Sequence, residues 1–163
     1  ENAEKSLLLY RDSFGEALIP LLSTNLGRAV YSQEFPYNLE LNGESYDMIM
    51  IELVERNIPN LLTGAPLMQA SEKQLPADAA SVSCTANAQK RSGFTQLYGS
   101  IAAYPVAERI YIEVACADGA VRIYEAFPVN DSGDADPAWE SASGYLLTLP
   151  EGIEGEVSGA YIG

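Results

Sequence analysis

The sequence predicts an α/β portion, part of a doubly wound parallel sheet, that continues into a small antiparallel β-sandwich. Three observations predict this fold class. Apolar runs alternate with a helical periodicity over residues 6–54, five short apolar runs follow residue 80, and a stretch rich in proline, alanine and glutamine at residues 59–80 separates the two patterns. We therefore place the α/β portion at residues 1–72 and the β-sandwich at residues 73–163.

Three strands are predicted in the first portion. Residues 6–10 form a short apolar run, residues 28–35 form a second strand, and residues 47–54 are almost continuously apolar, as in a parallel strand that is covered on both faces. One helix and three parallel strands cannot cover both faces of their own sheet. We therefore expect the missing half of a larger α/β domain to come from upstream or from another chain.

A helix is predicted between the first two strands. Ser13 and Glu16 have the spacing of a capping box, and apolar side chains then recur at helical spacing. Pro20 lies inside this pattern and is expected to kink or loosen the first turns, and Gly27 is a suitable stop.

Strands and turns dominate the second portion. Asp118 and Gly119 between two alternating runs predict a tight hairpin. The predicted strands are residues 81–85, 97–102, 109–115, 121–127 and 145–149.

Composition excludes several classes of function. The 163 residues are 47% hydrophobic, which is enough for a core, and 9 Lys and Arg against 23 Asp and Glu give a net charge of −14. Such an acidic surface disfavours nucleic acid and anionic membranes as partners, and no apolar stretch is long enough for insertion into a membrane. The chain has no histidine, which excludes a Ser-His or Cys-His mechanism completed within it and imidazole zinc sites. We expect no metal site and no cofactor.

A serine occupies the turn between the first strand and the helix, in the segment Arg-Asp-Ser-Phe-Gly at residues 11–15. Open α/β sheets bind ligands at the carboxyl ends of their strands, and N–H groups at a helix start can stabilise an oxyanion. This position suits Ser13 as a nucleophile for acyl transfer. The alternative is that Ser13 only caps the helix.

Four short segments occur in a fixed order around this turn: RDSF at 11–14, ALIPLL at 17–22, YDMIMI at 46–51 and Glu-Arg at 55–56. Together they resemble the SGNH-like family that includes the DHHW proteins and the alginate O-acetylation proteins. The resemblance covers residues 6–57 and implies a flavodoxin-like sheet, a nucleophilic Ser13, and Asp12 as a turn residue beside it. Arg11 stands where the family turn usually has glycine.

The family places its catalytic Asp and His upstream of the serine, in a motif that this chain lacks. The resemblance therefore implies the C-terminal portion of a longer protein, with the nucleophile but without its base. We predict that the chain alone is inactive. The chain shows no signal peptide, which fits either a cytosolic protein or a trimmed piece of an exported protein. The strand-like run almost at its start favours the second, located outside the cell, on its surface or in the periplasm.

Glu55 and Arg56 follow the third predicted strand and are expected at the same sheet edge as Ser13, where they form an active-site rim together with Arg11 and Asp12. The alternative for Glu55 and Arg56 is a surface salt bridge. Cys84 and Cys116 lie on predicted strands and would form either a disulfide or two small buried apolar side chains.

Two features of one acidic loop are candidates for binding. The run from Asn130 to Asp136 has spaced oxygen ligands for calcium, although such runs are usually solvated loops. Trp139 is a candidate for stacking on a sugar. The resulting hypothesis is the C-terminal part of an exported acyltransferase or esterase that acts on hydroxyls of a cell-surface polysaccharide or cell-wall glycan. The alternative is a catalytically inactive module that binds glycan or protein.

Overall fold

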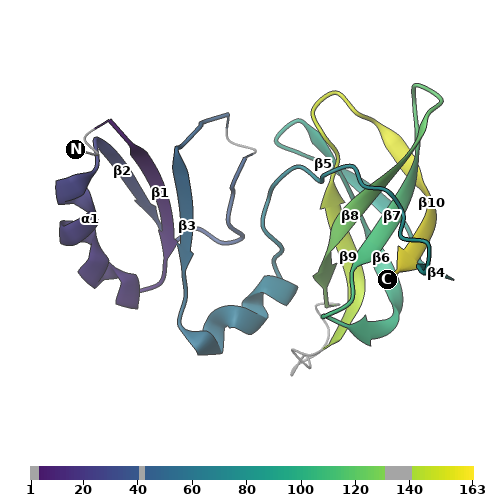
Figure 1. The fold of residues 1–163 in the computed structure, drawn as a ribbon, viewed down its shortest axis with the longest axis horizontal. Coiled ribbons are helices and arrows are strands. Elements are labelled where there is room, and N and C mark those ends of the chain that lie inside the picture. The colour runs from purple at the N-terminus through teal and green to yellow at the C-terminus, as the bar shows by residue number, and fades with distance from the viewer. Residues whose placement is uncertain (1–3, 41–42, 131–140) are drawn as a thin grey trace.

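The computed structural model describes residues 4–40, 43–130 and 141–163, which form two sheets (Figure 1). A three-stranded parallel sheet comes first and a seven-stranded antiparallel sheet follows. The fold is thus an α/β portion followed by an all-β portion. A short helix, η2 (Glu55–Leu62), and an extended segment join the two.

The parallel sheet has β1 (Ser6–Arg11) in its centre, between β2 (Arg28–Ser32) and β3 (Met48–Glu52). Leu9 lies opposite Tyr31 on one side and Met50 on the other. All three predicted strands are confirmed, the second and third with shorter bounds than expected. The carboxyl ends of β1 and β3 meet at one edge, where the chain turns at Ser13 and at Val54.

The helical segment divides into a 3-10 helix, η1 (Phe14–Leu18), and an α-helix, α1 (Ile19–Asn25), with Pro20 in its first turn. This division agrees with the loosening expected from the proline. The predicted capping box is wrong, because the Ser13 side chain makes no capping hydrogen bond. Ser13 itself has helical angles (φ −65°, ψ −22°) rather than the extended ones of a capping residue. Asp12, one residue earlier, accepts the Phe14 N–H at 2.8 Å instead.

The two faces of the parallel sheet are covered unequally. Leu7 and Leu9 of β1 are fully buried, and on the opposite face Leu8 and Tyr10 form a small core with Tyr37. The edge strand β3 is exposed along most of its length. The exposed fractions of its apolar side chains are Met48 46%, Ile49 41%, Met50 40% and Ile51 36%.

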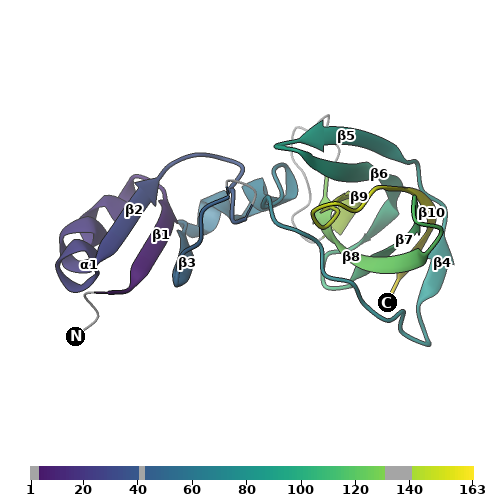
Figure 2. The same ribbon diagram turned by 90° about the horizontal axis from the view of Figure 1, so that it is seen from above.

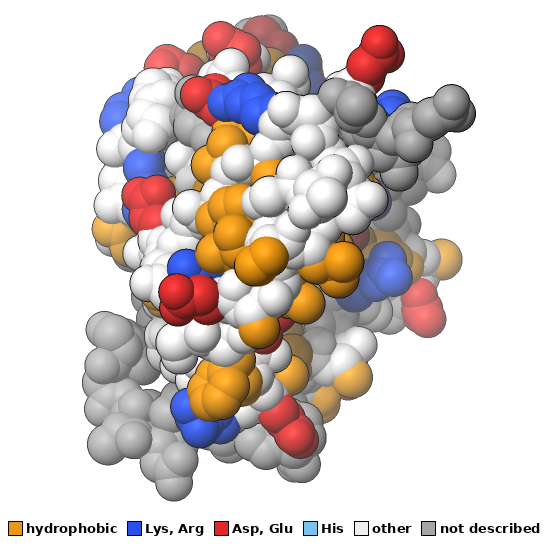
Figure 3. Space-filling model, turned by 90° about the vertical axis from the view of Figure 1, so that its left-hand side faces the viewer, with side chains coloured by type: hydrophobic (Ala, Val, Ile, Leu, Met, Phe, Trp, Pro, Cys, Tyr) orange, Lys and Arg blue, Asp and Glu red, His pale blue; other side chains and the backbone are white. Residues whose placement is uncertain are grey.

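Apolar side chains are also exposed on the helical side of this unit. Phe14, Leu18 and Leu21 are 60%, 36% and 65% exposed. Figure 3 looks onto this side, where hydrophobic side chains form an orange band across the surface. The unit therefore leaves much of its own apolar surface uncovered, as expected for one helix and three strands.

The segment after η2 packs along the second sheet. The Ala70 N–H donates to the Thr148 carbonyl at 2.7 Å, and the Lys73 N–H donates to the Ile123 carbonyl at 2.8 Å. Residues on both sides of the predicted boundary between 72 and 73 therefore contact the same sheet.

The second sheet contains all five predicted strands and two that the sequence did not predict. Gly119, with φ +83°, forms the predicted hairpin between β7 and β8. The strand order is β4-β10-β7-β8-β9-β6-β5. The bounds are β4 Ala80–Val82, β5 Asn87–Arg91, β6 Phe94–Pro105, β7 Ile110–Cys116, β8 Val121–Val129, β9 Ser141–Thr148 and β10 Gly155–Ile162.

The predicted two-layer sandwich is wrong, because these strands form one sheet that curls on itself (Figure 2). β4 pairs with β10, and the residues just after β4 reach the opposite side of the sheet. The Thr85 N–H donates to the Ser100 carbonyl at 2.9 Å, the Tyr145 hydroxyl donates to the Thr85 carbonyl at 2.9 Å, and Cys84 bridges Ile101. The core therefore lies inside the curl, where side chains of β6 to β10 meet.

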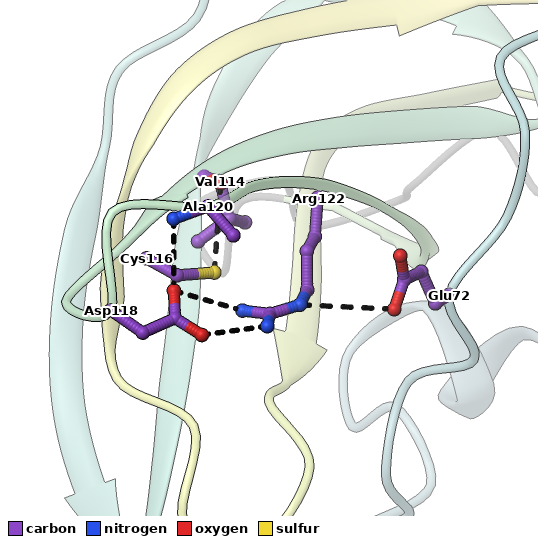
Figure 4. Close-up of polar contacts among 6 residues, drawn as sticks. All are labelled: Glu72, Val114, Cys116, Asp118, Ala120 and Arg122. Carbon is purple, nitrogen blue, oxygen red and sulfur yellow. Dashed lines mark hydrogen bonds and ion pairs between the residues drawn. The ribbon is translucent and has the colours of Figure 1, made fainter.

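Both cysteines belong to this interior and both are free thiols. Cys116 is buried at the end of β7, and Cys84 is half-buried. Beside Cys116, Arg122 pairs with Asp118 at 2.6 Å and with Glu72 at 3.9 Å, and so ties the β7–β8 hairpin to the connecting segment (Figure 4).

In the described part of the chain, no helix combines the length and apolar character needed to cross a membrane.

Candidate active site

Ser13 follows the central strand of the parallel sheet, at the edge formed by the carboxyl ends of β1 and β3. Its side chain is exposed and makes no hydrogen bond with any described residue. A hydroxyl that neither caps a helix nor packs in a core is available for chemistry or for solvent. This is the position that the sequence predicts for a nucleophile.

The Asp12 carboxylate stabilises the turn through three hydrogen bonds. It accepts the Phe14 N–H at 2.8 Å, the Val54 N–H at 2.9 Å and the Asn57 side-chain amide at 3.4 Å. Hydrogen bonds from these N–H groups hold the pKa of Asp12 below its ordinary value, and the bond from Val54 has the largest effect. Asp12 therefore joins the end of β1 to the end of β3, in agreement with its predicted role as a turn residue.

Arg11 and Glu52 are in register at the last positions of β1 and β3. The Arg11 Nη1 donates to the Asp12 carbonyl at 3.0 Å, but the Arg11 Nε and the Glu52 Oε2 are buried without a partner among the described residues. Gly15 is buried directly above them, and a side chain there would collide with the Glu52 carboxylate. Unsatisfied buried polar atoms are rare in native proteins, and two of them lie under the Ser13 turn.

Glu52 was not predicted as a site residue. The only signal in the sequence is an acidic residue that ends an apolar run, and such residues often lie at a solvated strand end. Its place beside Arg11 depends on the parallel register of β1 and β3, which sequence patterns do not specify.

The structure separates Glu55 from Arg56, the two predicted rim residues that lie at the start of η2. The Arg56 guanidinium lies over the Phe14 ring, 5.5 Å from its centroid, and so lies beside the Ser13 turn. Glu55 lines an apolar groove of ≈ 850 Å³ between η2 and the second sheet, with Phe127 and Pro128 on the opposite side. Neither residue forms a salt bridge with a described partner.

No described group accepts a hydrogen bond from the Ser13 hydroxyl. The chain has no histidine, and the Asp12 carboxylate accepts backbone N–H groups. Tyr37 is buried on the Asp12 side of the sheet, and burial, together with the charges of Asp12 and Glu52, raises the pKa of its hydroxyl. A serine hydroxyl is a weak nucleophile until a base takes its proton, and the described residues provide no hydrogen-bonded base for Ser13.

The described residues contain no cluster of three or more acidic, cysteine or histidine side chains that could hold a metal ion. Most of the acidic run from Asn130 to Asp136, and Trp139 as well, lie outside the described residues, so the calcium and stacking hypotheses stay predictions.

Comparisons with protein-family models, with curated proteins and with solved structures find no match for this chain.

Proposed function

We propose that this chain is the C-terminal portion of an exported SGNH-like serine acyltransferase or esterase that modifies hydroxyls of a cell-surface polysaccharide. Ser13 is the nucleophile, and the Asp and His of the base come from protein outside these residues. The observation that carries the proposal is the exposed Ser13 hydroxyl, without a hydrogen-bond partner among the described residues, at the carboxyl end of the central parallel strand.

The proposed chemistry is acyl transfer in two steps. The Ser13 Oγ attacks the acyl carbonyl while the external base takes its proton, and the leaving group departs to give an acyl-serine ester. A sugar hydroxyl or water then attacks this ester and releases Ser13. The Ser13 N–H would stabilise the oxyanion, and Arg56 over Phe14 would form the rim of the site.

Two further observations support an incomplete site. β3 presents four exposed apolar side chains and has β1 as its only described sheet neighbour, which suits pairing with further α/β structure. The unpartnered Arg11 Nε and Glu52 Oε2 lie at the same edge, where an added segment would supply hydrogen-bond partners.

The test combines intact mass with an activated-serine probe, such as a fluorophosphonate. Protein from its natural source should be heavier than this chain and should be labelled at Ser13, whereas this chain alone and a Ser13→Ala form of the natural protein should stay unlabelled. Ser23→Ala, which removes an exposed α1 hydroxyl, is the matched control and should keep the label. A natural protein of this chain's mass, or a heavier one that stays unlabelled, would overturn the proposal.

A second candidate is a catalytically inactive module that binds glycan or protein. The observation that favours it is that the Asp12 carboxylate accepts hydrogen bonds from the Val54 and Phe14 N–H groups, while the chain has no histidine that could act as the base. The probe experiment also tests this candidate, because an inactive module leaves Ser13 unlabelled in the natural protein.

A further inference from the structure

Arg11 is the last residue of β1 and lies at the edge formed by the carboxyl ends of β1 and β3, the lower edge of the parallel sheet in Figure 1. Its guanidinium Nη1 donates a hydrogen bond of 3.0 Å to the Asp12 carbonyl. That carbonyl belongs to the peptide group whose nitrogen is the backbone N–H of Ser13. Arg11 therefore binds the same peptide group that the proposed function uses to stabilise the oxyanion.

The two ends of this peptide group point in opposite directions, because the Asp12–Ser13 peptide is trans. The carbonyl oxygen accepts the bond from Arg11, and the N–H points away from it. The Ser13 N–H makes no hydrogen bond with a described group. It is therefore available to donate to an oxyanion that forms beside the Ser13 hydroxyl.

A charged donor on the carbonyl oxygen makes the N–H of the same peptide group a stronger donor. Amide resonance couples the two ends, because electron density drawn to the oxygen leaves the nitrogen more positive. Linked hydrogen bonds strengthen one another by roughly 10–30% per bond, and bonds from charged donors are about twice as strong as neutral ones. The Arg11 guanidinium thus strengthens the Ser13 N–H without contact with the reacting atoms.

The Arg11 side chain is positioned by packing and by this one bond. It forms no salt bridge with a described acidic residue, and its buried Nε has no described partner. Gly15 lies against it so closely that a Cβ on the glycine would be 2.8 Å from the Arg11 Cβ. The Glu52 carboxylate, opposite in register, lies against the same glycine. The hydrogen bond to the Asp12 carbonyl is therefore the only one that the guanidinium makes with described residues.

We infer that Arg11 is a positioning residue for acyl transfer, which polarises the Asp12–Ser13 peptide and strengthens the Ser13 N–H as the oxyanion donor. The inference rests on the proposed function and deepens it. Because the oxyanion exists only in the transition state and the tetrahedral intermediate, the effect falls on kcat rather than on KM. Loss of a whole oxyanion donor costs about 10²–10³ in kcat, so loss of its polarisation should cost less, about three- to tenfold.

The first test measures hydrolysis of p-nitrophenyl acetate by the natural protein. Arg11→Gln, which removes the charge, should lower kcat about three- to tenfold and leave KM within about twofold of the wild type. Arg11→Lys, which keeps a charged donor, should recover most of the loss. Arg28→Gln is the matched control, because it removes an arginine from the first position of β2, at the opposite edge of the same sheet. It should leave both constants unchanged.

The second test needs no activity and uses NMR of the purified chain. In Arg11→Gln, the Asp12 carbonyl ¹³C and the Ser13 amide ¹⁵N resonances should both move upfield, because the charged hydrogen bond to the carbonyl is lost. Arg11→Lys should move them less. The Phe14 amide resonance should stay in place in both variants, since its N–H bonds the Asp12 carboxylate and reports on the shape of the turn.

Three results would overturn the inference: a wild-type kcat in Arg11→Gln, a loss confined to KM, or Asp12 and Ser13 resonances that do not move. An inactive wild-type natural protein would overturn the proposed function and this inference with it, whereas an active wild type with an unaffected Arg11→Gln variant overturns this inference alone.

Circular dichroism of each variant checks its folding. If Arg11→Gln does not fold, Arg11→Lys decides the question. Its kcat relative to the wild type should fall as the pH rises above about 10, where a lysine side chain loses its charge and an arginine keeps it. A ratio that stays constant across this range would contradict the inference.

Discussion

At the scale of single residues, two carboxylates connect the same pair of strands at opposite ends. Asp12 joins the carboxyl ends of β1 and β3 through the Val54 N–H. Asp47 joins their amino ends, because it accepts the Ser6 N–H and the Ser6 hydroxyl, each at 2.8 Å, and pairs with Lys5 at 3.2 Å. An edge strand with little buried side-chain area is thus fixed to β1 by polar contacts at both ends.

The Asp47 contacts make stability depend on pH. Hydrogen bonds from Ser6, and to a smaller extent from Lys5, lower the pKa of Asp47 to about 2, below the ordinary value of 3.8. Because the folded-state pKa is the lower one, its stabilising effect is complete above about pH 4 and is lost as the pH falls toward 2. The difference in urea midpoint between wild type and Asp47→Asn should therefore shrink over this range.

The control for this prediction is Asp78→Asn, because the exposed Asp78 side chain makes no hydrogen bond with the described residues. Its midpoint should stay close to that of the wild type at every pH. A difference between wild type and Asp47→Asn that is the same at pH 7 and at pH 2.5 would show that the prediction is wrong.

Ser13 should contribute little to stability, unlike a capping serine. Its hydroxyl caps nothing in the structure, so Ser13→Ala should change the free energy of unfolding by less than about 0.5 kcal/mol. Loss of a true cap would cost about 1 kcal/mol. Urea denaturation of the two proteins distinguishes the outcomes, and a loss of about 1 kcal/mol would mean that the hydroxyl caps η1 in solution.

At the scale of elements, β1 and β3 differ sharply in burial although they are neighbours in one sheet. Leu9 and Met50 lie opposite each other, but Leu9 is fully buried and Met50 is 40% exposed. Leu9→Ala should lower the free energy of unfolding by about 2–5 kcal/mol. Met50→Ala should lower it by about 1 kcal/mol or less. Equal losses in urea denaturation would indicate that β3 is covered in solution.

The sequence predicts the elements of the parallel unit well because each has a local signal. The apolar runs give the strands, and Pro20 explains the change from η1 to α1. The capping role is misassigned by one residue, because the Phe14 N–H bonds the carboxylate of Asp12, which the Val54 N–H also holds from 42 positions away. The turn between β1 and η1 that carries Ser13 could be predicted, whereas the Arg11–Glu52 pair depends on sheet register.

The two strands that the sequence did not predict lack such local signals. Every residue of β5 is exposed, so its sequence shows no apolar alternation. β10 is rich in small residues and has an irregularity between Val157 and Gly159, which interrupts the period of two. Alternation in the other strands correctly indicates one buried face. Alternation does not indicate whether the buried face packs against a second sheet or lines the inside of one curled sheet. That outcome depends on contacts such as the one between Thr85 and Ser100, which the alternation does not specify.

At the scale of the whole molecule, the two sheets have separate cores with no residue in common. We therefore expect two unfolding transitions in calorimetry. Leu9→Ala should shift one of them, and Leu147→Ala, in the core of the curled sheet, should shift the other. A single transition that both variants shift equally would contradict this expectation.

The curled sheet also has a consequence for synthesis. β10 lies between β4 and β7, so β4 has no place in the sheet until the residues of β10 have been made. β6 to β9 can pair while the chain is still growing on the ribosome, but their sheet keeps an open edge at β7 during that interval. Exposed strand edges invite pairing with other chains. Nascent chains of this protein are therefore most vulnerable to aggregation just before β10 emerges from the ribosome.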